Sequence, residues 1–219
     1  MKKIATIPFT EIESIPVLIK DFLLKKIEGF EQTLFSFENI EKQFQLKGDS
    51  FAAEKRQILA EVLKKQHSGF QLSEKQEFNL NSTVEGNTFT VTTGHQLNLF
   101  SGPVFFIYKI LQTIKLANSL NEKFPQNKTV PIFWMASEDH DFEEINHFKT
   151  ENQYYETHAK SGGAVGTIRL EDNFFIDAFE EEFKDSVFGT ELILLLKKAY
   201  KKGNKLSEAT RILVQELFS

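Results

Sequence analysis

The chain has 219 residues, 41% of them hydrophobic and 13% aromatic, and a formal net charge of -5 at pH 7. This composition predicts a soluble globular protein with one large domain or two small ones. The acidic surplus disfavours nucleic acid as a partner, and no apolar stretch reaches the length that a membrane span needs. Because cysteine is absent, disulfides, a thiolate nucleophile and cysteine-bound metal are excluded. We expect a cytoplasmic protein.

Helical patterns dominate the first 87 residues. The expected segments are an extended start over 1–13, helices over 16–27, 50–67 and 73–84, and a loop-rich stretch over 30–45. The expected N-caps are Ser14, Asp49 or Ser50, and Ser73. The expected buried stripes are Leu18, Phe22, Leu23 and Ile27 in the first helix, and Phe51, Ile58, Leu59 and Val62 in the second. We therefore predict that residues 1–87 form an amino-terminal helical layer packed on a later sheet.

A βαβ pattern follows, and it begins the second predicted region, residues 88–219. Residues 88–93 alternate like a strand, and Gly94 to Gln96 is an expected turn. Pro103 starts an expected helix over 104–124, and residues 130–136 are rich in strand formers. In such a unit the two strands are parallel, and ligands bind beyond their carboxyl ends. The chain is thus predicted to be an α/β protein.

The remainder of the chain is predicted to leave the βαβ pattern. Residues 154–157 and 165–170 are expected to form a β-hairpin around a turn at Ser161 to Gly163. Helices are expected over 174–183, 191–202 and 207–218, with Ser207 capping the last. Because that helix would normally lead into a third parallel strand, we expect the chain to be an amino-terminal piece of a longer protein.

Two places carry residues suited to chemistry, and the first is the glycine corner between strand and helix. Backbone amides and the amino terminus of a helix can bind a phosphate or carboxylate group at such a corner. The residues expected there are Gly94, His95, Gln96, Ser101 and Gly102. Lys109 lies within two helical turns and can reach an anion there. The corner matches neither the Walker A motif nor the dinucleotide glycine motif. The alternative is that both glycines serve turn geometry alone.

The second place is an ionisable cluster directly after the second strand. It comprises Glu138, Asp139, His140, Asp141, Glu143, Glu144 and His147. A helix beginning near Asp141 would put Glu143 or Glu144 on one face with His147, an arrangement that can bind a metal. The second interpretation is substrate recognition or acid–base work, and the third is a solvated helix start that the helix dipole favours. Recognition is the interpretation that we favour, and no metal is assigned.

Other ionisable residues have simpler explanations. His67 is expected at a helix end and His158 in the hairpin, neither with a chemical role. Lys115 is expected on a solvated helix face, and Arg169 is a weaker candidate for contact with an anion.

The two motifs together resemble one known family, the bacillithiol-biosynthesis cysteine-adding enzymes called BshC. The matching segments of the sequence are Val91 to Pro103, Ile107 to Lys109, and Pro131 to His147. The resemblance is weaker in the flanks, where Gly163 to Leu170 still follows the family pattern. The run from Trp134 to His147 is highly specific.

The resemblance implies a Rossmann-like core related to class I aminoacyl-tRNA synthetases, followed by a carboxyl-terminal coiled coil that this chain lacks. The synthetase signature His-x-Gly-His is absent, and Gly94 to Gln96 occupies the comparable corner. The implied enzyme is a cysteine ligase that joins cysteine to glucosaminyl-malate through an activated carboxylate, with ATP as co-substrate. A homodimer through the coiled coil is also implied, and the fragment is expected to be inactive alone.

The resemblance also implies roles for individual residues. Those expected to be catalytic are Glu138, Asp139, His140 and His95. Those expected to bind substrate or nucleotide are Thr93, Gly94, Gln96, Ser101, Gly102, Lys109, Trp134, Ser137, Asp141, Glu144, Asn146 and His147. The alternatives are a non-catalytic nucleotide or small-molecule binding module, another class I-like ligase or nucleotidyltransferase, and a metal-dependent hydrolase.

Overall fold

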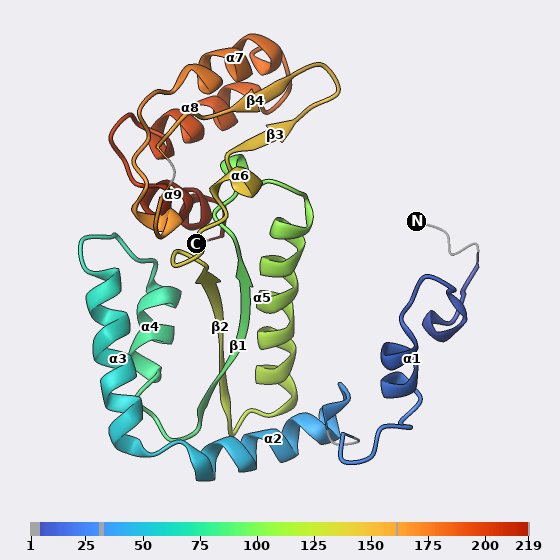
Figure 1. Ribbon diagram of the computed structural model, residues 1–219. Coiled ribbons are helices and arrows are strands. Elements are labelled where there is room, and N and C mark those ends of the chain that lie inside the picture. The colour runs from blue at the N-terminus through green and yellow to red at the C-terminus, as the bar shows by residue number, and fades with distance from the viewer. Residues whose placement is uncertain (1–4, 31–32, 161, 219) are drawn as a thin grey trace. The chain divides into compact units, whose positions relative to one another are not determined.

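The computed structural model describes residues 5–30, 33–160 and 162–218 (Figure 1). The chain divides into two compact units, residues 1–58 and 59–219. The first residues of the predicted extended start and Ser161 of the predicted turn lie outside the described residues.

The amino-terminal unit is more helical than the sequence predicted. It contains a 3-10 turn η1 (Phe9–Glu11), helix α1 (Val17–Leu23) and helix α2 (Phe37–Ser50). The prediction of a loop-rich stretch over 30–45 was wrong for residues 37–45, because Ser36 caps α2 by accepting a hydrogen bond from the Asn39 amide at 3.1 Å. The predicted cap Ser14 was also wrong, since Pro16 occupies the N-cap of α1. The apolar stripe of α1 is not buried, and Leu18 is exposed.

Helix α3 (Ala53–His67) crosses the boundary between the units and begins three residues later than predicted. Asp49 and Ser50 do not cap it, because both belong to the last turn of α2. Its predicted stripe was wrong as well: Ile58, Leu59 and Val62 are exposed, whereas Arg56 and Ala60 are buried. The buried face of α3 is therefore rotated away from its apolar stripe.

Helix α4 (Glu74–Ser82) begins with the predicted cap. The Ser73 hydroxyl accepts a hydrogen bond from the Gln76 amide at 3.3 Å, and the Gln76 side chain accepts one from the Ser73 amide at 2.9 Å. This reciprocal capping box satisfies two amides that would otherwise lack partners.

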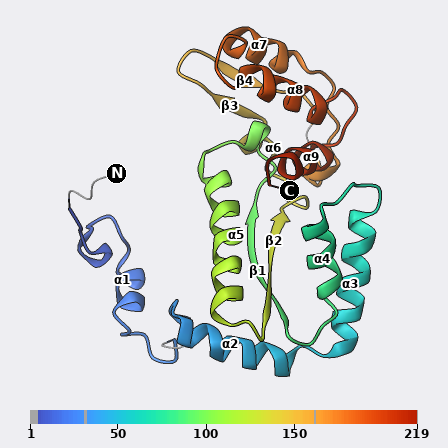
Figure 2. The ribbon, with the colours of Figure 1, turned by 180° about the vertical axis from the view of Figure 1, so that it is seen from behind.

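The predicted βαβ unit is confirmed. Strand β1 (Thr88–His95), helix α5 (Phe105–Lys123) and strand β2 (Lys128–Met135) follow one another, and the strands pair in parallel. Helix α5 packs on the strand pair, and both views place α4 on the opposite side (Figures 1 and 2). The register sets Gly94 beside Trp134 and His95 beside Met135, so these two residues continue the strand. The predicted turn at Gly94 was therefore wrong, because the parallel ladder extends to its end.

The carboxyl-terminal lobe, residues 142–160 and 162–218, covers the carboxyl ends of β1 and β2 (Figure 1). Its elements are α6 (Phe142–Ile145), β3 (His147–Lys149), β4 (Tyr154–Glu156), the 3-10 turn η4 (Val165–Thr167), α7 (Phe174–Phe183), α8 (Gly189–Ala199) and α9 (Leu206–Phe218). The three long helices confirm the sequence prediction, and α7 matches it at both ends. The predicted cap of the last helix was wrong: Ser207 lies inside α9, and its hydroxyl donates to the Gly166 carbonyl at 2.7 Å.

The predicted hairpin between residues 154–157 and 165–170 was wrong, because the two segments do not pair with each other. Strand β4 pairs antiparallel with β3, with His147 opposite Glu156. Residues 165–170 begin with η4 and then run beside residues 203–206, where the Leu170 amide donates to the Asn204 carbonyl at 3.0 Å. Strand β3 was not predicted; it is only three residues long and begins at His147, the last residue of the ionisable cluster.

One apolar core fills the carboxyl-terminal lobe. Its buried members include Ile176 of α7, Leu196 of α8 and Leu213 of α9. Leu97 and Leu99, which follow β1, are buried in the same core. The loop that leaves the first strand is thus anchored in the lobe. Within the described residues, none of the helices has both the length and the apolar character needed to cross a membrane.

Candidate functional site

The Gln96 side chain connects the ends of both parallel strands. It directly follows β1, and its Nε2 donates to Asp139 Oδ2 at 3.0 Å and to Glu144 Oε2 at 2.9 Å. Asp139 lies in the loop after β2, and Glu144 lies on α6. A primary amide has two N–H donors, and here each faces a carboxylate. We call Gln96, Asp139 and Glu144 the amide node.

Asp139 is held as a carboxylate by the node and by its own loop. Its Oδ1 accepts the backbone amides of His140 at 2.7 Å and Asp141 at 3.3 Å. The Gln96 hydrogen bond, followed by these two amides, lowers the pKa of Asp139 below its ordinary value of 3.8. Asp139 is therefore ionised at neutral pH, and its oxygens already accept several hydrogen bonds. This environment suits a carboxylate that positions neighbouring groups.

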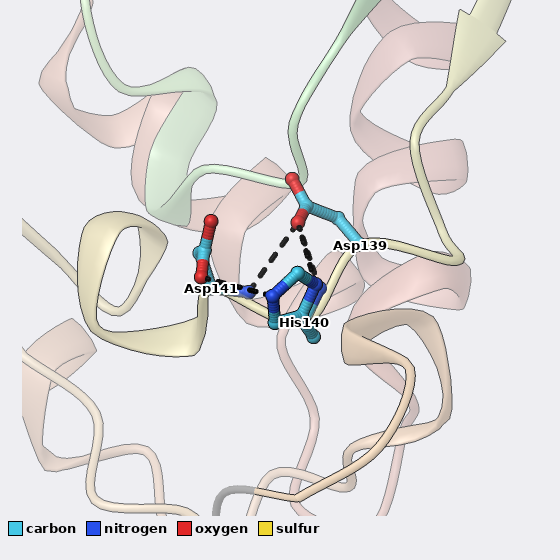
Figure 3. Close-up of side chains that lie close together, drawn as sticks. All are labelled: Asp139, His140 and Asp141. Carbon is cyan, nitrogen blue, oxygen red and sulfur yellow. Dashed lines mark hydrogen bonds and ion pairs between the residues drawn. The ribbon is translucent and has the colours of Figure 1, made fainter.

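Asp139, His140 and Asp141 form the cluster drawn in Figure 3. The His140 ring lies with Nδ1 3.8 Å from Asp139 Oδ1 and Nε2 3.6 Å from Asp141 Oδ1. One ligand atom from each of the three residues lies within 4.8 Å of the others, which is close enough for a metal ion. The His140 side chain is 82% exposed, whereas that of Asp139 is 23% exposed, so the open part of the cluster is His140.

His95, predicted among the catalytic residues, lies away from the carboxylates. Its ring packs against Phe105 at 5.3 Å and Phe106 at 5.1 Å, in the first turn of α5. Burial lowers the pKa of His95 below 6.5, so the ring is neutral at pH 7. The neighbouring Gln96 faces the carboxylates instead.

Lys109 and Trp134 lie at the ends of the strands, where the sequence placed them. Lys109 Nζ donates to the Gly94 carbonyl at 2.5 Å, which attaches α5 to the end of β1. Trp134 is 60% exposed, and its Nε1 lies 3.4 Å from Glu138 Oε1. An added Cβ at Gly94 would meet Trp134 only at ordinary contact distance, 3.4 Å from its carbonyl oxygen. Gly94 is thus not required by turn geometry.

Ser101 and Gly102 form a strained bend before α5. Phe100, Ser101 and Gly102 have φ of 53°, 73° and 61°, a run of left-handed backbone. A Cβ at Gly102 would lie 2.5 Å from Asn98 Cβ, so turn geometry does explain this glycine. Helix α5 then begins at Phe105 without a side-chain cap. The Phe106 amide donates to the Pro103 carbonyl at 2.9 Å and is not available to an anion, so the helix dipole is what favours negative charge here.

Ser137 supports the loop between β2 and α6. Its carbonyl accepts the Gly166 amide at 2.8 Å, and the Asp139 carbonyl accepts the Val165 amide at 2.7 Å. A Cβ at Gly166 would lie 2.6 Å from Ser137 Cβ. The turn η4 therefore fits closely behind the polar loop. Thr93, the remaining predicted contact, is partly buried near the end of β1.

Asn146 and His147 belong to a separate place, a cleft of about 500 Å³ between α6 and the β3–β4 hairpin. The predicted shared helix face was wrong, because α6 ends at Ile145 and His147 begins β3. Asn146 Nδ2 donates to Glu156 Oε1 at 3.2 Å, and His147 Nδ1 lies 2.9 Å from Asn146 Oδ1. Sequence reasoning did not identify Glu156, whose position opposite His147 depends on a strand pairing that it did not predict.

The remaining ionisable residues have mostly structural positions. His67 Nδ1 contacts the Leu63 carbonyl at 2.8 Å at the end of α3, as predicted. Lys115 is exposed on α5, also as predicted. The Arg169 guanidinium donates to the Gly203 carbonyl at 2.7 Å, so this side chain stabilises the backbone. His158 lines the cleft and is not part of a hairpin strand.

Comparison with known proteins identifies the family. Residues 4–219 match the family described as "Bacillithiol biosynthesis BshC, N-terminal Rossmann-like domain". The chain is 41% identical to a protein of Flavobacterium johnsoniae over 207 residues and 42% identical to one of Flavobacterium psychrophilum over 206 residues, each covering 92% of this chain. A third, from Christiangramia forsetii, is 38% identical over 222 residues, which cover 97% of this chain. All three bear the name "Putative cysteine ligase BshC".

These alignments cover 39%, 39% and 41% of the three relatives, so the chain spans about two fifths of their length. The family match covers nearly the whole chain, and the parallel β1–α5–β2 unit agrees with its description. The chain therefore belongs to the BshC family, in which it matches the amino-terminal Rossmann-like domain.

Proposed function

We propose that the complete protein is a ligase of bacillithiol biosynthesis that joins cysteine to glucosaminyl-malate through an activated carboxylate, with ATP as co-substrate. The observation that carries the proposal is the amide node, which fixes two carboxylates beside the ends of both parallel strands. In open α/β sheets this edge is where ligands bind. Membership of the BshC family supports the same assignment. In this proposal the core acts like that of a class I synthetase, and the remaining length supplies further strands and a coiled coil that forms a homodimer.

The anion side of the site would lie at the start of α5. The dipole of that helix and the Lys109 ammonium suit one phosphate group, and Lys109 is anchored there by the Gly94 carbonyl. ATP would supply the leaving group that makes the cysteine carboxylate reactive. Ser101 and Gly102 hold the bend that leads into this helix. Developing negative charge on the carboxylate would be stabilised by the same dipole.

The amine side would lie at the amide node. The carboxylates of Asp139, Asp141 and Glu144 attract an ammonium group, and we assign Asp139 as a positioning residue because its oxygens already accept Gln96 and two backbone amides. Among the described residues Glu138 has one hydrogen-bonding contact, at 3.4 Å from Trp134 Nε1, and we assign its carboxylate to take a proton from the attacking amine. His140, exposed beside Asp139, is the second candidate for that proton.

The experiment uses the complete protein with cysteine, glucosaminyl-malate and ATP, and detects the bacillithiol mass together with AMP or ADP. Glu138→Gln should lower kcat about 100-fold or more, as expected for loss of a general base. Glu181→Gln, on the exposed face of α7, is the matched control and should leave kcat unchanged. Undiminished turnover by a folded Glu138→Gln protein would remove Glu138 from the mechanism.

Absence of product from the wild-type protein would contradict the ligase assignment. Calorimetric binding of ATP or cysteine without turnover would then indicate a binding module. Nucleotide cleavage that depends on another acid would indicate a different ligase or a nucleotidyltransferase.

A further inference from the structure

Helix α8 has apolar residues on two faces. One face, which includes Ile193 and Leu196, is buried in the core of the lobe. Phe188, Leu192 and Leu195 recur at spacings of four and three residues, which puts them together on a second face. On that face Phe188 is 68% exposed, Leu192 is 40% exposed, and Leu195 is only partly buried. A surface helix usually has one apolar stripe, so the second face of α8 is suited to a partner.

The apolar face of α9 extends beyond the core of the lobe. Leu206, Leu213 and Leu217 lie on one side of this helix, because spacings of seven and four residues return to the same side. Leu206 and Leu213 are 2% and 4% exposed, whereas Leu217 is 41% exposed. The core therefore ends before the last turn of α9, and the apolar face of the helix continues past it.

The exposed parts of α8 and α9 form one groove. The two helices pack against each other, and the groove has a volume of about 290 Å³. Its lining consists of four leucines and three charged residues, namely Leu192, Leu194, Leu195, Leu217, Glu191, Lys198 and Glu216. Leu194 is 64% exposed, and Lys198 Nζ lies 2.5 Å from Glu216 Oε1. Exposed apolar patches that are bordered by polar residues mark contact sites for other protein segments.

The longer relatives indicate what covers this groove. The matched family model describes an amino-terminal domain, and the alignments cover only 39–41% of the three relatives. Most of each relative therefore lies outside the matched part. A segment of the same polypeptide is tethered to the lobe, and its effective concentration exceeds that of a second, free molecule.

We propose that a helix from the carboxyl-terminal part of the complete protein packs into the groove between α8 and α9. An amphipathic helix that lies in an apolar groove is a recurring form of protein recognition. Its apolar side chains would cover the four leucines of the lining. A lysine or arginine of this helix would face Glu191 and Glu216, because these two carboxylates outnumber the single ammonium group of Lys198. The inference goes beyond the proposed function and does not depend on the ligase reaction.

The test uses the complete protein with one introduced cysteine on either wall of the groove, Leu194→Cys or Leu217→Cys. Residues 1–219 contain no cysteine, so the introduced thiol is the only one in this part of the chain. Mass spectrometry of the peptide that carries it measures the rate of labelling by N-ethylmaleimide. Both variants should react about tenfold or more slowly than Glu181→Cys, a control on α7 outside the groove whose side chain is 72% exposed.

A photoreactive benzoylphenylalanine in place of Leu194 identifies the occupant of the groove. We expect a cross-link to a peptide that follows residue 219. In a mixture of unlabelled and isotope-labelled protein, the cross-link should join peptides of the same isotope only, as expected for two segments of one polypeptide.

Two outcomes would overturn the inference. Labelling of both groove variants as fast as that of Glu181→Cys would show that the groove is open to solvent in the complete protein. A cross-link to residues 1–219, or one between differently labelled chains, would show that the carboxyl-terminal part of the same chain is not the occupant. Turnover by the same variants reports on the ligase proposal separately, since an active enzyme with an open groove removes this inference alone.

Discussion

The β1–α5–β2 unit and the carboxyl-terminal lobe bury their side chains to different extents. In the strands, Ile132 and Phe133 are only partly buried and Trp134 is exposed. In the lobe, Ile176, Leu170 and Tyr200 are almost fully buried. The strand end that presents the predicted chemistry is thus more open than the core of the lobe, although α5 of the same unit buries Phe106 and Leu120.

The lobe also determines the backbone of the corner before α5. The Phe100 ring packs against Phe148 at 4.6 Å, Phe179 at 5.2 Å and Tyr200 at 5.2 Å, all in the lobe. The Phe100 amide donates to the Tyr200 hydroxyl at 3.0 Å. A left-handed backbone at an aromatic residue is unfavourable, so these contacts must stabilise it. Side chains far along the chain therefore stabilise the backbone geometry of residues 100–102 before α5.

The largest expected effect is a loss of stability, seen when one residue type, isoleucine, is replaced in each of the two regions. Ile176→Ala should lower the free energy of unfolding by about 2–5 kcal/mol, because it leaves a cavity in the core of the lobe. Ile132→Ala, on the partly buried strand, should cost about 1 kcal/mol or less. Urea unfolding measures both. Equal losses would contradict the difference in packing.

The bend before α5 gives the second comparison. Gly102→Ala should cost about 2–4 kcal/mol, because it adds a Cβ 2.5 Å from Asn98 Cβ at a residue with φ of 61°. Gly86→Ala is the control, since nothing lies within 4 Å of its added Cβ. If thermal unfolding showed both variants to be equally stable, the bend would not be strained.

Removal of the Tyr200 hydroxyl tests the connection between lobe and corner. Tyr200→Phe should cost about 1–2 kcal/mol, because the Phe100 amide loses its acceptor in a buried place. Tyr108→Phe, at a residue that is 65% exposed, should be neutral. A fully stable Tyr200→Phe protein would show that packing alone holds the bend.

The smallest expected effect is a pH dependence within the lobe. Hydrogen bonds from Tyr155 first, and then from Thr150 and Asn152, hold the pKa of Glu182 below its ordinary value of 4.5. A carboxylate with a lowered folded pKa stabilises the fold fully above its unfolded pKa, and this contribution is lost as the pH falls through the folded pKa.

The melting temperature of the wild type should therefore fall more steeply below pH 4.5 than that of Glu182→Gln. Glu181→Gln, its exposed neighbour on α7, should keep the wild-type slope. Identical slopes for wild type and Glu182→Gln would mean that these hydrogen bonds are not formed in solution.

Local patterns predicted the parts of the fold that depend on local physics. The periodicity of apolar residues correctly predicted α5, α7 and the parallel strands, and Ser73 correctly predicted the start of α4. Helix α2 was missed, although Phe37, Ile40 and Phe44 recur at helical spacing and Ser36 is a strong cap. The prediction of a hairpin was wrong because residues 165–170 have a strand-like sequence but lie beside residues 203–206.

The candidate site was predicted as a set of residues and not as an arrangement. Gln96, Asp139 and Glu144 were all selected, but a hydrogen bond across more than forty residues leaves no local signal. His95 was predicted to be catalytic, together with Glu138, Asp139 and His140, from the family resemblance. Alternation along β1 instead turns its ring toward Phe105 and Phe106.

The amide node is tested most directly by turnover of the complete protein carrying Gln96→Leu. Without its donors, Asp139 and Glu144 would repel each other, and kcat for bacillithiol formation should fall at least tenfold while the melting temperature changes little. Gln112→Leu, at an exposed residue of α5, is the control and should retain full activity. Wild-type kcat and KM in a folded Gln96→Leu protein would contradict the account.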